Sequence, residues 1–302
     1  MSRHVAVLMG GWSAEREVSL VSGQAAVEAL RARGWQVSPV DVGRDLPARL
    51  AELRPDVVYN ALHGRFGEDG TVQGLLEIMG IPYSHSGVLA SSLAMNKAMA
   101  KRLFATAGLR CAEGVVTTVS ALLADGAPMD PPYVVKPNGE GSSVGVKVVR
   151  QSAERPIDRN DWPYGPEILV ERYIAGRELT VGVLGDRPLA VTEIRHQHNF
   201  FDYHAKYTAN EAEHLIPAPL APELYQRALD HALAAHRLLG CRGVSRADFR
   251  LDEDDPDGLF LLEVNTQPGM TPISLVPEQA AYVGIAVADL VERLVEDARC
   301  DA

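Results

Sequence analysis

Two carboxylates and an amide near the C-terminal end of the chain have the residue types of a magnesium site. Asp248 precedes Glu263 by fifteen residues, and Asn265 follows Glu263 with one residue between them. All three carry hard oxygen donors, which Mg²⁺ prefers, and Mg²⁺ usually keeps water and substrate phosphates as its other ligands. The alternative is that these residues simply face water on a strand. The apolar residues around Glu263 favour the metal, because a partly buried carboxylate needs a partner.

A strand–turn–strand arrangement would bring these three residues together. Side chains alternate along a strand, so Glu263 and Asn265 share one face, whereas Leu262 and Val264 point into a core. The acidic stretch before this strand is rich in aspartate and ends in glycine, which is typical of a turn. We therefore expect a hairpin that places Asp248 beside the same patch.

A glycine-rich loop, residues 136–145, has the composition of a phosphate-binding segment. It reads KPNGEGSSVG, and glycines and serines let backbone and hydroxyl donors approach phosphate oxygens closely. It is neither a Walker loop nor the dinucleotide fingerprint, and an ordinary flexible hairpin is the alternative. Lys136 ends an apolar strand just before the loop, where its cation could hold a phosphate as a point charge.

Four further polar residues lie at predicted strand ends. Glu171 and Glu178 flank a short connection, and the Glu171 carboxylate could accept hydrogen bonds from a ribose or an adenine amino group. Glu15 could hold a substrate ammonium, and His63 could donate to a carboxylate. Taken singly, each is more often a solvated loop or strand-end residue, so these roles depend on the neighbouring motifs.

The polar stretch 196–213 is long for a loop without secondary structure. Such loops are usually functional or disordered, and its aromatic residues argue against plain disorder. We expect it to form a lid over the site. His196, His198 and His204 lack helical or hairpin spacing, so the sequence argues against a histidine metal cluster.

The composition is that of a soluble globular protein. The chain has 302 residues, 46% hydrophobic and 23% charged, which predicts two or three domains. A net charge of −11 without a basic cluster argues against nucleic acid as a partner. The apolar run Val5–Met9 is too short for a signal peptide, and no run reaches membrane length. Three widely spaced cysteines predict free thiols and a cytoplasmic protein.

The first 95 residues predict an open parallel α/β sheet. Apolar segments typical of buried strands span residues 4–9, 36–42 and 55–62, with helical segments after the first strand and around 45–54 and 71–79. The first helix should bury one face, comprising Val18, Val21, Ala25 and Ala29. Ligands collect beyond the carboxyl ends of such strands, where residues 10–15 and 63–70 lie.

The pattern of helix-like and strand-like segments changes near residues 95 and 178, which predicts three domains. The second region has a helical segment at 96–104 and strand-like segments at 132–137, 144–149 and 168–171. The third has strands near 179–184 and 188–195, a helix over 222–239 and the predicted hairpin. We expect a substrate-binding α/β domain (1–95), a small subdomain with the glycine-rich loop (96–178), and a C-terminal subdomain with the lid and metal site (179–302).

Read together, these segments resemble the D-alanine–D-alanine ligases of the ATP-grasp superfamily over essentially the whole chain. The motifs that carry the resemblance are GGWSAEREVS (10–19), LHGRFGEDG (62–70), MNK (95–97), VKPNGEGSSVG (135–145), HAKY (204–207), SRAD (245–248) and EVNTQPGMT (263–271). The implied fold class is α/β (α+β ATP-grasp): an open parallel α/β domain followed by two α+β subdomains that hold ATP between them.

The resemblance also implies a role for individual residues. Asp248, Glu263 and Asn265 would hold two Mg²⁺ ions, for which Mn²⁺ can substitute. The residues that would contact ATP are Lys97, Lys136, Glu140, Ser143, Glu171, Arg172, Ile174, Glu178 and Lys206. The residues that would bind D-alanine or act in catalysis are Glu15, His63, Ser142, Tyr207, Arg246, Gly269, Ser274 and Leu275.

Among these, Glu15 would hold the ammonium of the first D-alanine, with His63 beside its carboxylate. Ser142 and Tyr207 would form a hydrogen-bonded arrangement with Glu15, linking the first domain to two loops. Arg246 and the backbone of Gly269 would stabilise an oxyanion.

The second D-alanine's carboxylate would bind at Ser274 and Leu275. Two positions depart from the family pattern: Arg172 stands where many relatives have lysine, and Ile273 replaces a residue that is polar in some relatives. The first matters little if that contact is through the backbone, and the second could alter packing at the second site.

The implied activity is the ATP-dependent synthesis of D-alanyl-D-alanine, a peptidoglycan precursor, through a D-alanyl phosphate. Tyr207 is retained, and its replacement by Phe accompanies D-lactate as second substrate in this family, so a dipeptide is favoured over a depsipeptide. The alternatives are a D-alanyl-D-lactate ligase, another ATP-grasp carboxylate–amine ligase, and a nucleotide-binding regulatory protein without catalysis. A homodimer is the family expectation.

Overall fold

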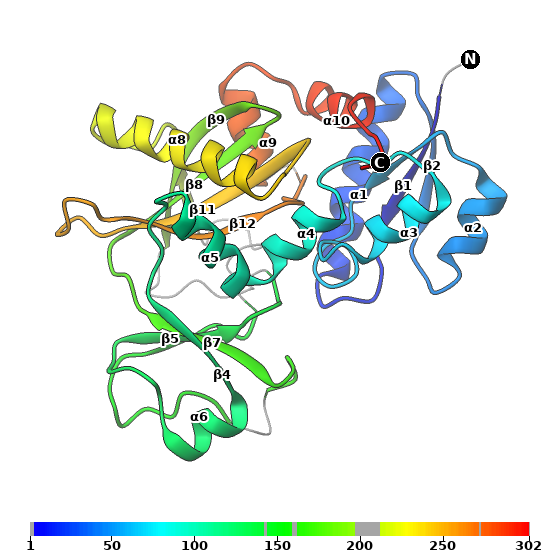
Figure 1. The fold of residues 1–302 in the computed structure, drawn as a ribbon. Helices are drawn as coiled ribbons and strands as arrows, with labels where there is room; N and C mark the ends of the chain where they lie inside the picture. The colour runs from blue at the N-terminus through cyan, green and yellow to red at the C-terminus, as the bar shows by residue number, and fades with distance from the viewer. Residues whose placement is uncertain (1–2, 142–143, 159–161, 197–211, 272, 302) are drawn as a thin grey trace.

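The structure, a computed structural model, describes residues 3–141, 144–158, 162–196, 212–271 and 273–301. Its strands form three separate sheets of three, four and five strands, and Figure 1 shows them as three lobes around a common centre. The mixture of helices with one parallel and two antiparallel sheets confirms the predicted α/β fold class. The residue limits proposed for the three domains stay predictions.

The N-terminal sheet is parallel, as the sequence predicts. Its strands are ordered β2-β1-β3 and both neighbours run parallel to β1. The strands are β1 (His4–Met9), β2 (Gln36–Asp41) and β3 (Val57–Asn60). The helices of this lobe are α1 (Arg16–Ala32), α2 (Leu46–Leu53), α3 (Thr71–Met79) and α4 (Val88–Met95). The loops that follow β1 and β3 therefore meet at one edge of the sheet.

Helix α1 buries a different face from the one predicted. Val18 is buried, but Val21 is 52% exposed, so the face predicted from Val21 is wrong. The buried side instead carries mostly small residues, among them Ser19, Ser22, Gly23, Ala26 and Val27. A Cβ atom on Gly23 would lie 2.5 Å from the Cβ of Met9. The helix therefore approaches β1 too closely for a row of large side chains, and the sequence periodicity did not reveal this.

The small lobe is an antiparallel four-stranded sheet ordered β4-β7-β5-β6. Helix α5 (Lys97–Thr106) leads into it from α4. The strands are β4 (Gly114–Thr118), β5 (Tyr133–Pro137), β6 (Lys147–Val149) and β7 (Glu167–Arg172), and α6 (Val119–Asp125) packs against them. Strand β6 is shorter than predicted, because residues 144 and 145 form a turn and the strand begins only at Lys147.

The C-terminal lobe is an antiparallel five-stranded sheet ordered β10-β9-β8-β11-β12. The strands are β8 (Arg177–Leu184), β9 (Arg187–His196), β10 (Ala212–Leu215), β11 (Val244–Leu251) and β12 (Leu259–Asn265). The helices are α8 (Pro222–Leu238), α9 (Leu275–Tyr282) and α10 (Val287–Glu296). The small sheet lies below this one in Figure 1.

The predicted hairpin is confirmed, with one local irregularity. Strands β11 and β12 pair antiparallel with Asp248 opposite Glu263, but Phe249 pairs with Leu261, so Leu262 is an extra residue in a bulge. A bulge turns a side chain to the other face of a strand. Leu262 consequently lines a cavity instead of the core, and the prediction that it faces the core is wrong. Val264 is buried in the core as predicted.

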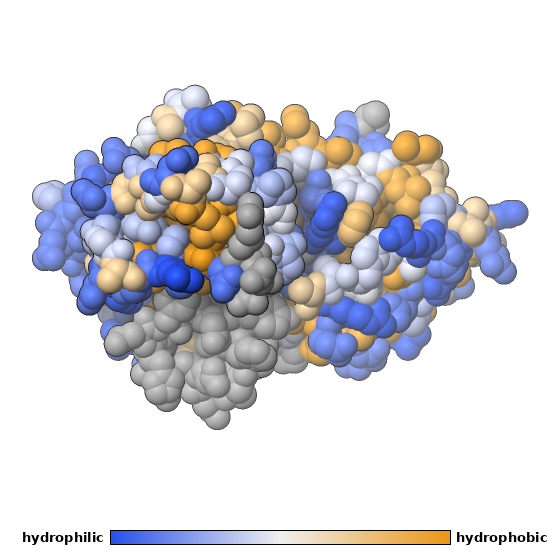
Figure 2. Space-filling model, turned by 90° about the horizontal axis from the view of Figure 1, so that it is seen from below, coloured by the Kyte–Doolittle hydropathy of each residue, from blue (hydrophilic) through white to orange (hydrophobic). Residues whose placement is uncertain are grey.

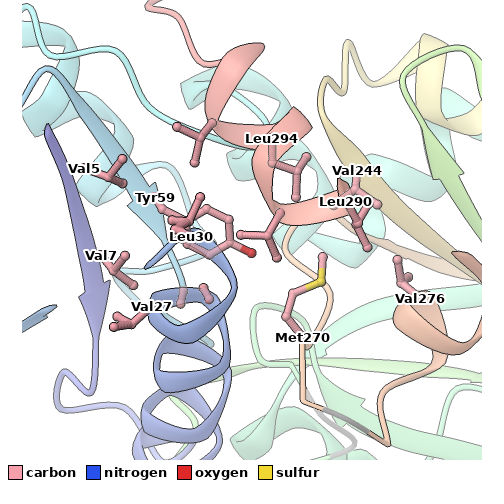
Figure 3. Close-up of a cluster of buried hydrophobic side chains, with 14 of the residues drawn as sticks. Val5, Val7, Val27, Leu30, Tyr59, Val244, Met270, Val276, Leu290 and Leu294 are labelled. Carbon is pink, nitrogen blue, oxygen red and sulfur yellow. The ribbon is translucent and has the colours of Figure 1, made fainter. Parts of the chain in front are cut away.

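One apolar core joins the first lobe to the C-terminal lobe. Figure 3 shows Val5, Leu30 and Tyr59 of the first lobe beside Leu290 and Leu294 of α10. Buried hydrogen bonds reinforce the junction: Gln267 Nε2 donates to the carbonyls of Asn60 and Leu62 at 2.7 and 3.0 Å, and Asn60 Nδ2 donates to Gln267 Oε1 at 3.0 Å. This junction fixes the loops after β1 and β3 relative to the end of β12.

The face of the molecule that is seen from below in Figure 2 is mainly polar. Hydrophilic side chains cover both ends of this face, and apolar side chains gather in patches on each of the two large lobes (Figure 2). Within the ranges that the structure describes, no helix has the length and apolar character to cross a membrane.

Candidate active site

Two adjoining cavities occupy the centre of the molecule. The first, of about 110 Å³, lies between the first lobe, β11–β12 and the start of α9. The second, of about 190 Å³, lies between the small sheet and the C-terminal sheet. They share one wall, made of Lys97, Glu140, Gly141, Glu178 and Glu263. A ligand in one cavity can therefore reach a ligand in the other.

The acidic trio lies on the wall of the first cavity. Asp248 accepts hydrogen bonds from Arg246, whose Nε is 2.8 Å from Oδ1 and whose Nη2 is 2.7 Å from Oδ2. Thr180 Oγ1 also donates to Asp248 Oδ1 at 2.7 Å. Glu263 Oε2 lies 3.2 Å from Lys97 Nζ. These two carboxylates of the cavity wall are thus each paired with a cation.

The donor set fits a hard cation. Asp248 and Glu263 are cross-strand partners, and the Asn265 amide oxygen accepts from Gln267 N at 2.8 Å. No group of three or more His, Cys, Asp and Glu side chains able to hold a metal occurs in the described part of the chain. A cation here would therefore need the amide and substrate oxygens as further ligands, which is how Mg²⁺ usually binds.

Lysine and glutamate side chains pair in the second cavity. Both oxygens of the Glu171 carboxylate are taken, one by Lys136 and one by Lys101, and Glu171 is only 3% exposed. Burial raises the pKa of Glu171, but the two lysines outweigh it, so its pKa lies below the ordinary value. Each of these carboxylate oxygens has a further lone pair, so the contact of Glu171 with a nucleoside stays a prediction.

The other residues predicted to bind ATP that the structure describes line the same cavity. Glu178 pairs with Arg250 at 3.5 Å, and Arg250 Nε donates to the carbonyl of Ile174 at 3.2 Å. The side chain of Arg172 is half-exposed and lies over the ring of Phe260. Of this group, Ile174 is buried and supplies an apolar wall.

Lys97 binds the glycine-rich loop. Its Nζ donates to the backbone carbonyl of Glu140 at 2.5 Å. Burial raises the pKa of the Glu140 carboxyl, against the opposing charges of Arg65 and Lys97. The start of α5 and the loop are thus held together at the wall that both cavities share.

Glu15 and His63 are both buried at the first cavity, where the loops after β1 and β3 meet. Glu15 Oε2 lies beside Gly141 of the glycine-rich loop, 3.3 Å from where a Cβ on that glycine would be. His63 Nδ1 is 3.1 Å from Glu68 Oε1, and its Nε2 is 3.2 Å from Ser22 Oγ. A carboxylate and a histidine–carboxylate pair therefore face one small polar pocket.

The N-terminus of α9 closes the opposite side of the first cavity. Ser274 is the N-cap residue, and its Oγ accepts from Thr271 N at 3.0 Å. Gly269 lies close to the same hydroxyl, and a Cβ there would lie 3.0 Å from Ser274 Oγ. Leu275 begins the helix and also lines the cavity. Unpaired backbone N–H groups at a helix N-terminus favour a carboxylate.

Four predicted site residues lie outside the described residues: Ser142, Ser143, Lys206 and Tyr207. Most of the predicted lid, residues 197–211, also lies outside them. Its flanks are described, and Ala212 pairs with His196 across β10 and β9. The lid stays a prediction.

Sequence reasoning missed several residues of the site, namely Glu68, Lys101, Thr180, Arg250 and Leu262. One signal was available for Lys101, which lies four residues after Lys97 and so on the same helical face. The partners of Thr180 and Arg250 come from distant strands, which no local pattern reveals.

The His63–Glu68 pair predicts a pH-dependent stability. Burial lowers the pKa of His63, but Glu68, with smaller contributions from Glu15 and a backbone bond, raises it above the ordinary value, which is about 6.5. Stabilisation by protonated His63 is thus complete below about pH 6.5 and lost as the pH rises through the raised pKa. In the wild type, the free energy of unfolding should therefore decrease as the pH rises through this pKa. In Glu68→Gln, the same measurement should show no such decrease.

An NMR titration of the His63 ring checks the same prediction directly. The wild-type ring should titrate above the ordinary value, and the ring in Glu68→Gln should titrate lower. A wild-type ring that titrates at or below about pH 6.5 would contradict the assignment.

Models of one enzyme family match most of the chain. Residues 123–296 match the model described as the D-ala D-ala ligase C-terminus, and residues 48–86 match the D-ala D-ala ligase N-terminus. The first match alone covers more than half of the 302 residues.

Full-length relatives carry the same name. A D-alanine–D-alanine ligase of Rhodospirillum rubrum is 56% identical over 306 residues, and one of Methylocella silvestris is 57% identical over 309 residues, each match covering 100% of both chains. The solved D-alanine–D-alanine ligase from Bacillus anthracis complexed with ATP is 32% identical, with a TM-score of 0.79 over 98% of this chain and 96% of that one.

Proposed function

The chain belongs to the D-alanine–D-alanine ligase family, and from this premise we propose that it joins two D-alanines with ATP to form D-alanyl-D-alanine for peptidoglycan synthesis. The observation that carries the proposal is the shared wall of the two cavities. A nucleotide in the second cavity can direct its phosphates across that wall to a substrate beside Glu15 and His63. The division into domains 1–95, 96–178 and 179–302 belongs to the same proposal.

The first D-alanine binds between Glu15 and the His63–Glu68 pair. The buried Glu15 carboxylate holds the substrate ammonium, because a buried carboxylate is stabilised by an opposite charge. His63, whose pKa is raised by Glu68, donates to the substrate carboxylate. That carboxylate then points towards the wall shared with the nucleotide cavity.

ATP binds with its base and ribose between the small sheet and the C-terminal sheet. The backbone of Glu171 and Arg172 and the side chains of Ile174 and Glu178 hold the nucleoside. Lys97 and Lys136 hold phosphates as point charges. Glu140, Ser143 and Lys206 complete the proposed contacts.

Asp248, Glu263 and Asn265 would hold two Mg²⁺ ions, or Mn²⁺ in their place. When bound, these ions would neutralise phosphate charge during phosphoryl transfer. Their oxygen donors and their place on the cavity wall support this assignment.

The reaction divides into two steps. A carboxylate is a poor acyl donor to an amine, so the first D-alanine takes the γ-phosphoryl group of ATP and becomes an acyl phosphate, with release of ADP. The amine of the second D-alanine then attacks the carbonyl carbon, and phosphate leaves. Arg246 and the Gly269 amide stabilise the tetrahedral oxyanion. Ser274 and Leu275, at the positive end of α9, hold the second carboxylate.

Water exclusion protects the acyl phosphate. Closure of the lid over the cavities, with Ser142 and Tyr207 joined to Glu15, would keep water from hydrolysing this intermediate. We further propose that the protein lies in the cytoplasm, where its substrates are made and used. We also propose that it is a homodimer. The negative charge of the chain supports small-molecule substrates over nucleic acid.

An amino-acid panel tests the proposal. With ATP and Mg²⁺, D-alanine should stimulate phosphate release and yield D-alanyl-D-alanine, whereas L-alanine should not. With D-alanine and D-lactate together, dipeptide should exceed depsipeptide, as retention of Tyr207 predicts. A dominant depsipeptide would indicate the D-lactate alternative, and no response to D-alanine would refute the proposed substrate.

A further inference from the structure

Lys101 is a buried lysine of α5 that does not line either active-site cavity. It lies one helical turn after Lys97 and is 8% exposed. Its ammonium contacts one oxygen of Glu171, whereas Lys136 contacts the other. Lys136 and Glu171 line the nucleotide cavity, and Lys101 lines a separate cavity on the other side of α5 and β7. Lys101 therefore reaches the nucleotide site only through Glu171.

The trio holds more positive charge than its carboxylate needs. Two lysines face one glutamate, and all three side chains are buried. A single lysine would neutralise Glu171, and a second buried cation is costly unless an anion balances it. The excess charge faces the nucleotide cavity through Lys136, so the trio has the charge of a site built for an anionic ligand.

We propose that Lys101 is a positioning residue that neutralises and orients Glu171, and so keeps the charge of Lys136 available to the phosphates of the nucleotide. This proposal rests on the proposed role of Lys136 in ATP binding. Without Lys101, Glu171 would take Lys136 as its only cation. The pair would then be neutral, and the attraction for phosphate would fall.

A stability role alone explains the arrangement less well. Replacing a buried ion pair by apolar residues is often neutral for stability, so a purely structural site has no need of a second lysine. Holding Glu171 between two ammonium groups also fixes where Lys136 Nζ lies. Both effects act on the phosphate end of the nucleotide and leave the base pocket unchanged.

Nucleotide binding by Lys101→Met tests the proposal without any turnover. Calorimetry in the absence of D-alanine measures the Kd of ATP, ADP and adenosine for the full chain. ATP and ADP should bind about tenfold more weakly, the effect expected from losing roughly one charge–charge interaction in a partly buried site. Adenosine, which has no phosphate, should bind as it does to the wild type. Lys101→Arg should keep most of the ATP affinity.

Lys147→Met is a matched control. Lys147 is an exposed lysine of β6 whose Nζ donates to a backbone carbonyl, so its loss changes net charge equally without touching the trio. Its ATP affinity should equal that of the wild type. If Lys147→Met weakens ATP binding as much as Lys101→Met does, the effect comes from overall charge and the proposal is overturned.

A double-mutant cycle separates the electrostatic role from a loss of folding. In the Glu171→Gln background there is no glutamate charge left to neutralise, so adding Lys101→Met should change ATP affinity much less than it does in the wild type. The double variant removes both charges of the Lys101–Glu171 pair together, so neither of these two groups stays buried without the other, and thermal unfolding of each variant reports its fold. Additive losses would overturn the proposal.

The possible outcomes separate this inference from the proposed function. Equal loss of adenosine and ATP affinity in Lys101→Met would assign Lys101 a structural role only, and unchanged ATP affinity would also refute the inference. A wild-type protein that binds no ATP would instead refute the proposed function itself.

Discussion

The substitution Glu263→Gln is expected to abolish ligation while the fold is retained. Glu263 stands opposite Asp248 on the wall that both cavities share, with Lys97 Nζ at 3.2 Å. Glutamine keeps the shape but removes the charge, so the site loses a carboxylate ligand and Lys97 loses its counter-ion. Turnover should fall by at least about a thousandfold, since metal ions contribute several kcal/mol to charge stabilisation.

Three measurements check this expectation. Phosphate release with D-alanine reports turnover, Mn²⁺ binding followed by electron paramagnetic resonance reports the site itself, and thermal unfolding reports the fold. Glu296→Gln, the same change at an exposed residue of α10, should leave all three unchanged. Near-normal turnover and Mn²⁺ binding in Glu263→Gln would remove Glu263 from the proposed ligands.

Local sequence patterns were sufficient to predict the structural features that depend only on residues close together in the chain. Alternation and turn composition predicted the β11–β12 hairpin and the approach of Asp248 to Glu263, both of which the structure confirms. Apolar runs that end in glycine predicted the parallel N-terminal sheet. These features follow from periods and turns that span only a few residues.

Features that depend on distant neighbours were not predictable from one sequence. The bulge that turns Leu262 towards the nucleotide cavity arises from pairing with β11, and the strand alone shows unbroken alternation. The close approach of Gly23 to Met9 sets the buried face of α1. Both cases show that packing between elements overrides a local pattern.

The pairing of charges was hidden for the same reason. The sequence predicted Lys136 as a phosphate contact and Glu171 as a nucleoside contact, but their strands lie side by side and the two side chains bind each other. Lys101, from a helix 70 residues before Glu171 in the chain, completes the trio. A motif reveals which charges are present, and only the fold reveals which of them already have partners.

Replacing Arg246 by lysine is expected to uncouple the two steps of the reaction. The planar guanidinium of Arg246 binds Asp248 through two parallel hydrogen bonds at 2.8 and 2.7 Å while it lines the first cavity. Lysine keeps the charge but lacks this fork, so it cannot both hold Asp248 and donate to an oxyanion. Dipeptide formation should fall by about 10²- to 10³-fold, the usual effect of losing an oxyanion donor.

The ratio of phosphate to dipeptide distinguishes this role from a role in ATP binding. If Arg246 acts on the attack by the second D-alanine, acyl phosphate still forms in Arg246→Lys and is hydrolysed, so more phosphate is released per dipeptide than in the wild type. Arg237→Lys is a suitable control, because Arg237 makes a similar contact with Asp186 on the exposed surface. If phosphate release and dipeptide formation fall equally, Arg246 acts in the first step. Losing an oxyanion donor of the second step would leave phosphoryl transfer intact.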